Sequence, residues 1–228
     1  MLSAEEWGFV ALSLKVGGVA VLVTLPVAFA IAWILARYRF PGRTLVDALV
    51  HLPLVLPPVV TGWLLLIAFG PFGPVGRWLE SWFGMTLMFR WTGAALAAAI
   101  MALPLMVRAM RLSIEGIDHR LEGAARTLGA GRWHAFRTIS LPLALPGVLA
   151  ALVLGFARSI GEFGATITFV SNIPGETRTL PLALYTALQT PGGEAMAARL
   201  ATISFTLGLA GLLISEFLAR RVRRMLGR

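Results

Sequence analysis

The sequence contains no cysteine and only three histidines, His51, His119 and His134. The chain can therefore form neither a disulfide nor a thiolate metal site, and the histidines do not have metal-ligand spacing. It also lacks a nucleophile, a base and an orienting residue in a pattern that indicates catalysis. These absences argue against metal or cysteine chemistry and against a membrane-embedded enzyme.

Charged residues are also scarce: they make up 14% of the chain, and apolar residues make up 57%, against about 25% and 45–50% in soluble domains. Five stretches approach or exceed the roughly 18 apolar residues that suggest a spanning helix. They cover residues 9–36, 48–69, 92–110, 141–157 and 200–219. The first stretch follows Glu5 and Glu6 rather than a basic segment and is too long for a signal peptide, so we expect it to be retained. The sequence thus predicts an all-α membrane protein in which residues 1–228 form one transmembrane domain of five helices in a lipid bilayer.

The formal net charge of +9 is unevenly distributed among the connections between these stretches. Fourteen of the nineteen arginines lie within residues 37–43, 108–137 and 220–228, on one set of alternating connections. Because basic residues concentrate on the cytoplasmic side of a membrane, these connections are predicted to be cytoplasmic, with the N-terminus outside and the C-terminus inside. The basic C-terminal run is typical of a topology anchor near anionic lipid, so no nucleic-acid partner is expected.

Three prolines, Pro53, Pro57 and Pro58, interrupt the second apolar stretch. Each removes a backbone donor at membrane depth, which is tolerated only where protein or water satisfies the freed carbonyls. Broken helices of this kind surround transport sites, so Pro57, Pro58 and Thr61 are candidate pathway-lining residues. A kinked helix used only for packing is the alternative.

A polar, arginine-rich segment separates the third and fourth apolar stretches. Asp118 is suited to cap a helix at about 119–128, and Gly129 is suited to the left-handed position after its end. Beyond the glycine, residues spaced three apart predict a second short helix with an apolar edge. Apolar residues also recur at helical spacing at Ile114, Ile117, Leu121, Ala124, Ala125 and Leu128. An amphipathic helix in a cytoplasmic loop, here placed at 112–141, indicates a docking surface for a partner.

This segment resembles the EAA loop of bacterial ABC-importer permeases, in which EAA, three residues, Gly, nine residues and Ile are followed by one residue and Leu-Pro. Ala124 and Ala125 fall on the two alanines, and the closing residues have the same spacing from Gly129. Gly123 occupies the glutamate position, with Glu122 one place earlier, which rotates the acid by about 100° around a helix. The residues that the resemblance assigns to ATPase coupling are Glu122, Gly123, Ala124, Ala125, Leu128, Gly129, Ala130, Trp133, Phe136, Ile139, Leu141 and Pro142.

The resemblance implies a type I ABC-importer permease core. The chain contains no GxxxxGK[ST] phosphate loop, so ATP and Mg would be held by a separate ATPase and no cofactor is expected on this chain. The segments HLPLVLPPVV (51–60), GEFGA (161–165) and NIPGETRTLP (172–181) resemble those of molybdate permease subunits. That resemblance implies molybdate as substrate, a homodimer, two cytoplasmic ABC ATPases, a periplasmic molybdate-binding protein and the bacterial inner membrane. Sulfate or tungstate permeases remain alternatives. The alternative from a different class, an ATP-independent secondary anion carrier, should show internal repeats and intramembrane charges for ion coupling. The sequence shows no repeat, and Lys15 is its main intramembrane charge.

The region 158–199 is predicted to form a structured periplasmic segment with a short helix near 180–188. Its hydroxyl groups and glycine backbone N–H groups are neutral donors that an anion pathway could use without trapping its cargo. Arg158 and Glu162 are four residues apart and can pair, so an architectural role is expected for Glu162. The full set of candidate pathway-lining residues is Pro57, Pro58, Thr61, Ser159, Gly161, Glu162, Phe163, Gly164 and Thr166.

Overall fold

The structure, a computed structural model, describes the backbone of residues 3–225 and their side chains except at positions 119, 212, 215, 216 and 218–225. The regular elements in this range are all helical. In chain order they are α1 (Ala4–Arg37), α2 (Arg43–Val55), α3 (Pro58–Phe69), α4 (Pro74–Phe83), α5 (Trp91–Glu115), α6 (His119–Thr127), α7 (Arg132–Ala135), the π-helical turn η1 (Phe136–Ser140), α8 (Leu141–Ile160), α9 (Gly164–Val170), α10 (Leu180–Gln189) and α11 (Glu194–Met225).

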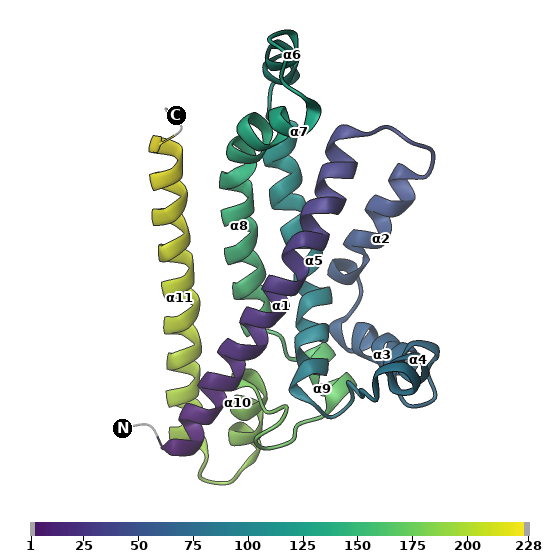
Figure 1. Ribbon diagram of the computed structural model, residues 1–228. Coiled ribbons are helices and arrows are strands. Elements are labelled where there is room, and N and C mark those ends of the chain that lie inside the picture. Colours follow the sequence, from purple (N-terminus) through teal and green to yellow (C-terminus); the bar gives the residue numbers. More distant parts are fainter. Residues whose placement is uncertain (1–2, 226–228) are drawn as a thin grey trace.

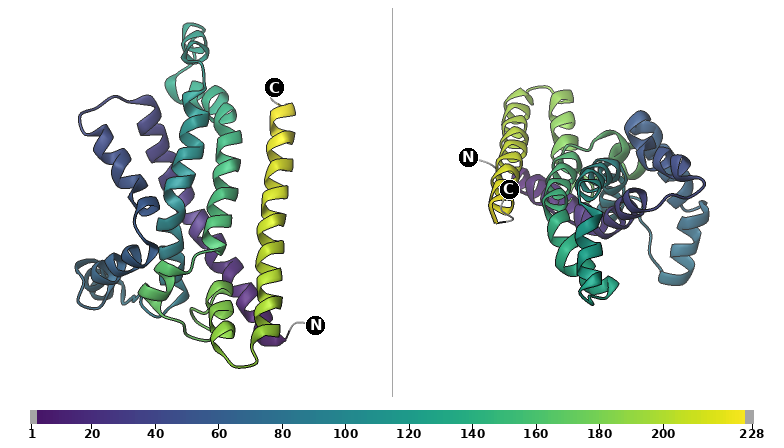
Figure 2. Two further views of the ribbon diagram at one scale, coloured as in Figure 1. Left: turned by 180° about the vertical axis from the view of Figure 1, so that it is seen from behind. Right: turned by 90° about the horizontal axis from the view of Figure 1, so that it is seen from above.

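Three long helices, α1, α5 and α8, pack together and form what we call the frame (Figures 1 and 2). Small side chains let their backbones approach closely. A Cβ atom added to Gly147 of α8 would lie 2.2 Å from the Ser113 Cβ of α5, and one added to Gly155 would lie 2.6 Å from the Met106 Sδ. Gly147 is therefore required by the crossing of α5 and α8, whereas a side chain at position 155 would displace the flexible Met106 side chain.

Among the residues that the structure describes, three segments are long and apolar enough to cross a membrane: α1 with 34 residues, α5 with 25, and the continuous helix Arg132–Ile160 with 29. The predicted stretch 9–36 lies inside α1, and 141–157 lies inside α8. Helix α5 runs five residues beyond the predicted end at 110, and Arg111 and Glu115 pair four residues apart along this added turn. The predicted loop 112–141 thus begins inside α5.

The predicted stretch 48–69 is two helices, α2 and α3, bent by 115° at the break between them. We call this pair the arm. Pro57 precedes α3 and Pro58 is its first residue, where the missing N–H costs no helical hydrogen bond. The interruption predicted from the prolines is therefore present, and Pro53 is accommodated within α2.

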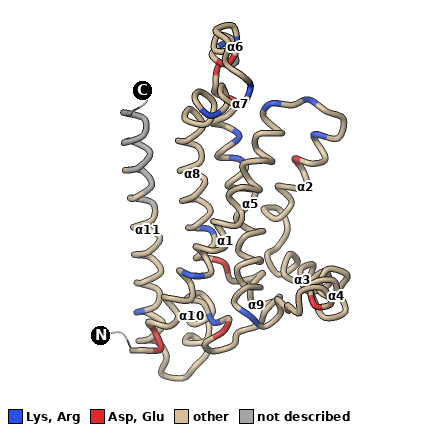
Figure 3. The backbone as a smooth tube through the Cα atoms, in the orientation of Figure 1, with Lys and Arg blue, Asp and Glu red and all other residues tan. Residues whose placement is uncertain are grey.

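Different helices lie at the two ends of the molecule (Figure 1). The start of α1 lies at the same end of the molecule as α9, α10 and the α3–α4 corner, whereas α6 and α7 project at the opposite end, toward which α11 runs. Basic residues gather along the α1–α2 connection and around α6 and α7 (Figure 3).

Between α9 and α10, the fully buried Thr177 hydroxyl accepts a hydrogen bond from the Ile173 N–H and donates one to the Ser171 carbonyl.

Candidate functional site

Helix α6 has defined caps at both ends. The Asp118 carboxylate accepts a hydrogen bond of 2.8 Å from the Arg120 N–H, as expected for an N-cap. Gly129 has a φ of +91°, and the Ala130 N–H donates back to the Ala125 carbonyl over 3.0 Å. The Gly129 N–H donates to the Arg126 carbonyl, which completes a Schellman motif. The cap and the glycine turn predicted from the sequence are both present.

The turn after α6 presents an apolar surface to solvent. Leu128 is 89% exposed, Trp133 is 68% exposed, and Leu121 is also exposed. Ile114 and Ile117, by contrast, are buried in the core that α1, α5 and α8 form. The prediction of one apolar stripe through both groups was therefore wrong, because the chain turns at Gly116 and only the later residues belong to α6.

The acid of this loop points inward and braces the loop against the frame. Glu122 Oε1 lies 2.6 Å from the Arg37 Nη2 at the end of α1, and the Ser140 hydroxyl donates to the same oxygen. The Arg37 side chain is only 7% exposed. Gly123 is exposed, and a Cβ there would meet nothing within 4 Å. Because of the one-residue offset, Glu122 faces the frame, whereas Gly123, at the family's glutamate position, faces solvent.

Aromatic side chains extend this brace. The Arg37 guanidinium lies 5.0 Å from the Trp33 ring centroid, and Trp33 meets Phe136 edge to face at 5.0 Å. Phe136 in turn stacks on Trp133 at 5.3 Å. Sequence analysis did not identify Arg37 or Ser140 as partners of Glu122. No short-range signal could have found Arg37, since it is 85 residues away in the chain.

The second part of the loop is continuous with the frame. Within η1 the Leu141 N–H donates to the Phe136 carbonyl, the i to i+5 pattern of a π-helix. No break separates Arg132 from Ile160, so α7, η1 and α8 form one rod. Of the predicted coupling residues here, Ala130, Phe136, Ile139 and Pro142 are half-buried, whereas Ala124 and Leu141 are exposed. A displacement of the loop would pass directly to α8 and, through the Glu122–Arg37 ion pair, to α1.

Two of the predicted pathway residues, Pro58 and Gly164, meet where α9 packs against α3. A Cβ on Gly62 would lie 2.6 Å from the Ala165 carbonyl oxygen, and one on Gly164 would lie 2.8 Å from the Pro58 Cβ. The two short helices therefore touch backbone to backbone. Glu162 is 2% exposed and uses both carboxylate oxygens: Oε2 pairs with Arg158 Nη1 at 2.6 Å, and Oε1 accepts from the Ala165 N–H. Glu162 therefore connects the end of α8, which carries Arg158, to the start of α9, which contains Ala165.

The remaining pathway candidates divide into buried and exposed residues. Thr61, Ser159 and Thr166 are buried, and the Thr61 and Ser159 hydroxyls have no hydrogen-bond partner in the part of the chain that the structure describes. Phe163 contacts the Tyr185 ring of α10 at 5.1 Å between centroids. The exposed candidates are Pro57, Pro58 and Gly161. Their role in lining a pathway stays a prediction.

A helical membrane frame, a bent arm and a projecting braced loop define a polytopic subunit of the permease type. Residues 28–224 match the family described as binding-protein-dependent transport system inner membrane component, and the chain belongs to this family. It is 61% identical over the full length of both chains to the molybdenum transport system permease protein ModB of Escherichia coli (strain K12). The sulfate transport system permease protein CysT of the same strain is 39% identical over 86% of this chain and 70% of its own.

The fold is also that of solved transporters. The crystal structure of a bacterial ABC transporter involved in the import of the acidic polysaccharide alginate matches with a TM-score of 0.75 at 19% identity. That match covers 96% of this chain and 80% of the alginate transporter chain. The chain is therefore a multi-pass component of the inner membrane with an ABC-importer permease fold.

Proposed function

We propose that this chain is the membrane-spanning subunit of an ATP-driven importer that passes molybdate from a periplasmic binding protein to the cytoplasm. The observation that carries the proposal is the 61% identity to the molybdenum permease over the whole chain, against 39% to the sulfate permease over part of it. Sulfate and tungstate permeases are the rival assignments within the same class.

The loop 118–142 is the coupling element in this proposal. Two cytoplasmic ABC ATPases, which hold ATP and Mg, dock on the exposed surface formed by Leu121, Leu128 and Trp133 of each permease chain. The brace from Glu122 to Arg37 and the unbroken rod Arg132–Ile160 support this role, since both pass displacement of α6 into the frame. The chain itself makes and breaks no covalent bond.

A homodimer is part of the proposal because another protein surface must shield the bend of the arm from lipid. At the 115° bend between α2 and α3 the backbone leaves helical hydrogen bonding, and lipid cannot satisfy the freed groups. Val55 at this bend is 81% exposed in the single chain, and α2 contributes no buried residue. A second copy facing the arm around a shared water-filled pathway would cover it, with the two arms rocking against their frames during alternating access.

The proposed topology has five spans, with the N-terminus outside and the C-terminus inside. The three long helices and the arm supply four of them. The fifth is α11, whose 32 residues are ample for a bilayer of about 30 Å at about 1.5 Å per residue. This arrangement puts the loop 118–142 in the cytoplasm and the region around α9 and α10 where a periplasmic carrier would arrive.

The test is ATP hydrolysis by the full complex in proteoliposomes, with carrier protein loaded with molybdate, tungstate or sulfate. Molybdate-loaded carrier is expected to stimulate hydrolysis and uptake far more than sulfate-loaded carrier. Equal stimulation by the two would reject the molybdate assignment, and uptake without ATP would reject an ABC importer.

A further inference from the structure

An open groove of about 500 Å³ lies between the last turns of α1 and the start of the rod. Its lining residues come from both elements: Phe29, Ala30, Trp33, Ile34, Arg132, Trp133 and Phe136. The Phe136 ring meets Trp33 edge to face at 5.0 Å and Phe29 at 6.4 Å between centroids, which joins the rod to α1 at this level. The floor of the groove is therefore aromatic, and Ala30 and Ile34 are exposed beside it.

The groove has a cationic end and an apolar end. Because α1 and the rod run in opposite directions (Figure 1), Arg132, one turn before Phe136, lies toward the Arg37 end of α1. Phe29 lies at the other end, eight residues before Arg37, or about 12 Å along the helix at about 1.5 Å per residue. One leaflet contributes about half of the roughly 30 Å of bilayer hydrocarbon. The groove thus runs from the membrane surface to the depth of the acyl chains.

The groove opens on the side of α1 that is turned away from the frame. Leu22, Val23 and Val27 on this side are exposed, whereas Ala28 and Ala32 on the other side are completely buried. Lipid tails are as apolar as leucine side chains, so a lipid tail is a suitable neighbour for this surface.

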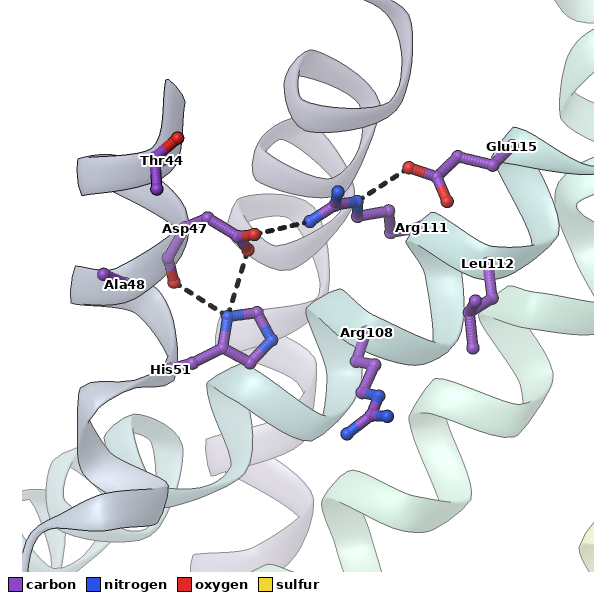
Figure 4. Close-up of a pocket in the computed structure, with 8 residues that line it drawn as sticks. All are labelled: Thr44, Asp47, Ala48, His51, Arg108, Arg111, Leu112 and Glu115. Carbon is purple, nitrogen blue, oxygen red and sulfur yellow. Dashed lines mark hydrogen bonds and ion pairs between the residues drawn. The ribbon is translucent and has the colours of Figure 1, made fainter. Parts of the chain in front are cut away.

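The charge of the groove differs from that of the cavity between α2 and α5, which Figure 4 shows. In that cavity Arg111 lies 2.9 Å from Asp47 Oδ2 and 2.8 Å from Glu115 Oε1, so carboxylates balance its charge. The described lining of the groove contains Arg132 and no acid. The Arg132 side chain is exposed and forms no ion pair or hydrogen bond with any residue that the structure describes.

A second hollow adjoins the cationic end of the groove. It shares Arg132 and is lined also by Arg126, Thr127 and the glycine turn of the loop, again with no acid among its described lining residues. The acid of this loop, Glu122, is held by Arg37 and Ser140. The entrance of the groove is therefore positively charged, and a guanidinium fork matches two oxygens of a phosphate.

We propose that the groove binds an anionic phospholipid of the leaflet next to the loop, which is the cytoplasmic leaflet in the topology proposed above. The lipid phosphate contacts Arg132 at the membrane surface, and one acyl chain lies along Phe29, Trp33 and Ile34. A phospholipid fits better than free phosphate, because the cation continues directly into an apolar groove at the depth of the acyl chains.

The bound lipid would also contact the residues that join the loop to the frame. Trp33 lies 5.0 Å from the Arg37 guanidinium, which pairs with Glu122. Phe136 stacks on Trp133 at 5.3 Å. An acyl chain packed against Trp33 and Phe136 would therefore stabilise the brace between loop and frame.

The experiment uses the full-length chain in nanodiscs that contain equal amounts of phosphatidylglycerol and phosphatidylcholine, without carrier protein or ATPase. Native mass spectrometry of the released protein measures the lipid that it retains. Arg132→Gln should lower the preference for phosphatidylglycerol about fivefold, the usual contribution of one basic residue near an anionic lipid surface. Arg132→Lys should keep most of the preference. Arg39→Gln is the matched control, because Arg39 is an exposed arginine of the α1–α2 connection outside the groove.

A second pair of variants tests the acyl-chain part of the site. Ala30→Phe fills the groove from α1 without changing Arg132, and it should lower the retention of phosphatidylglycerol several-fold. Ala11→Phe adds the same side chain at an exposed position of α1 outside the groove, and it should retain lipid like the wild type.

Loss of the phosphatidylglycerol preference with Arg132→Gln and loss of lipid with Ala30→Phe, with both controls unchanged, support the site. Equal retention by the wild type and either test variant, or no preference for phosphatidylglycerol in the wild type, overturns it. If Arg132→Gln retains lipid but weakens binding of the ATPase, the groove belongs to the ATPase docking surface and the lipid site is rejected. Since lipid retention is measured without carrier or transported anion, its outcome is independent of the molybdate assignment.

Discussion

The frame and the arm are both built from largely apolar helices, yet they pack in different ways. In the frame, Ala28, Ala32, Ala102 and Ala151 are completely buried, and glycines allow the helices to cross at close range. In the arm, α2 has no buried residue, and α3 buries only Thr61, Gly62 and Leu65. A closely packed interior resists deformation, whereas an element with few buried contacts moves at low cost. The difference assigns rigidity to the frame and motion to α2 of the arm, because α3 packs backbone to backbone against α9.

The arm is also linked to the frame by different chemistry. Its described polar contacts to α5 are the ion pairs Asp47–Arg111 and Arg43–Glu115, which water can replace. The frame is held by apolar side chains that pack against one another, and water offers no comparable contact when they are separated. We therefore expect substitutions in the frame to affect folding and those at the loop and arm to affect transport.

The first prediction concerns the frame and carries the largest expected effect. Gly147→Leu should sharply lower the yield of folded protein, because its side chain would overlap Ser113 of α5, where a Cβ already falls at 2.2 Å. Overpacking of this kind costs about 1–3 kcal/mol or more. Size-exclusion profiles and thermal melting in detergent measure the loss. Gly18→Leu on α1, where a Cβ meets nothing within 4 Å, is the control and should fold normally. Equal yields would contradict close packing between α5 and α8.

The second prediction concerns the coupling loop. Gly129→Val should leave the chain inserted but strongly reduce ATP-driven uptake, because a β-branched residue at a φ of +91° would distort the turn that presents Leu128. Gly131→Val is the matched control: Gly131 has an ordinary φ of −65°, and its Cβ would also meet nothing within 4 Å. Carrier-stimulated ATPase activity and uptake are measured together. The account is wrong here if both variants behave alike.

The third prediction concerns the brace between loop and frame. Glu122→Gln should lower the ratio of anions imported to ATP hydrolysed several-fold, since a neutral amide holds the Arg37 guanidinium less tightly than a carboxylate. A double-mutant cycle with Arg37→Gln should give a coupling of about 1–2 kcal/mol in thermal stability. Additive effects of the two substitutions would show that the ion pair does not contribute.

The fourth prediction has the smallest expected effect on activity. Because the chain contains no cysteine, Val55→Cys introduces a single thiol at the exposed bend of the arm. It should cross-link two copies on oxidation, while the reduced, unlinked variant should keep uptake close to normal. Phe205→Cys, 70% exposed on α11 at the opposite edge of the molecule from the arm (Figure 2), is the control and should remain uncrosslinked. Cross-linking at position 205 but not at position 55 would show that the dimer interface lies on the α11 side of the molecule, which would contradict the proposed dimer.

Local features of the fold could be predicted because local rules govern them. The N-cap at Asp118, the left-handed Gly129 and the interruption at Pro57 and Pro58 each depend on a few neighbouring residues, and all are present. The helical class and the family follow in the same way from composition and motif. The end of α5 was missed because charged residues near a membrane surface continue a helix as readily as they end one.

The contacts between distant segments could not be predicted. The partners of Glu122, namely Arg37 and Ser140, are brought to it by the crossing of α1, α6 and η1. The same holds for the meeting of Gly62 with Ala165 and for the cavity between α2 and α5. Sequence periodicity shows which face of a helix is polar, but only the packing of whole helices determines which other face it meets.

Motion of the arm against the frame can be tested most directly by preventing it. Thr44 and Leu112 line the same cavity from α2 and α5, so a cleavable bismaleimide between cysteines at these positions would fix the arm in the otherwise cysteine-free chain. We expect the bridged transporter to lose molybdate uptake in proteoliposomes, and to recover it when the linker is cleaved. Undiminished uptake by the fully bridged transporter would contradict the account.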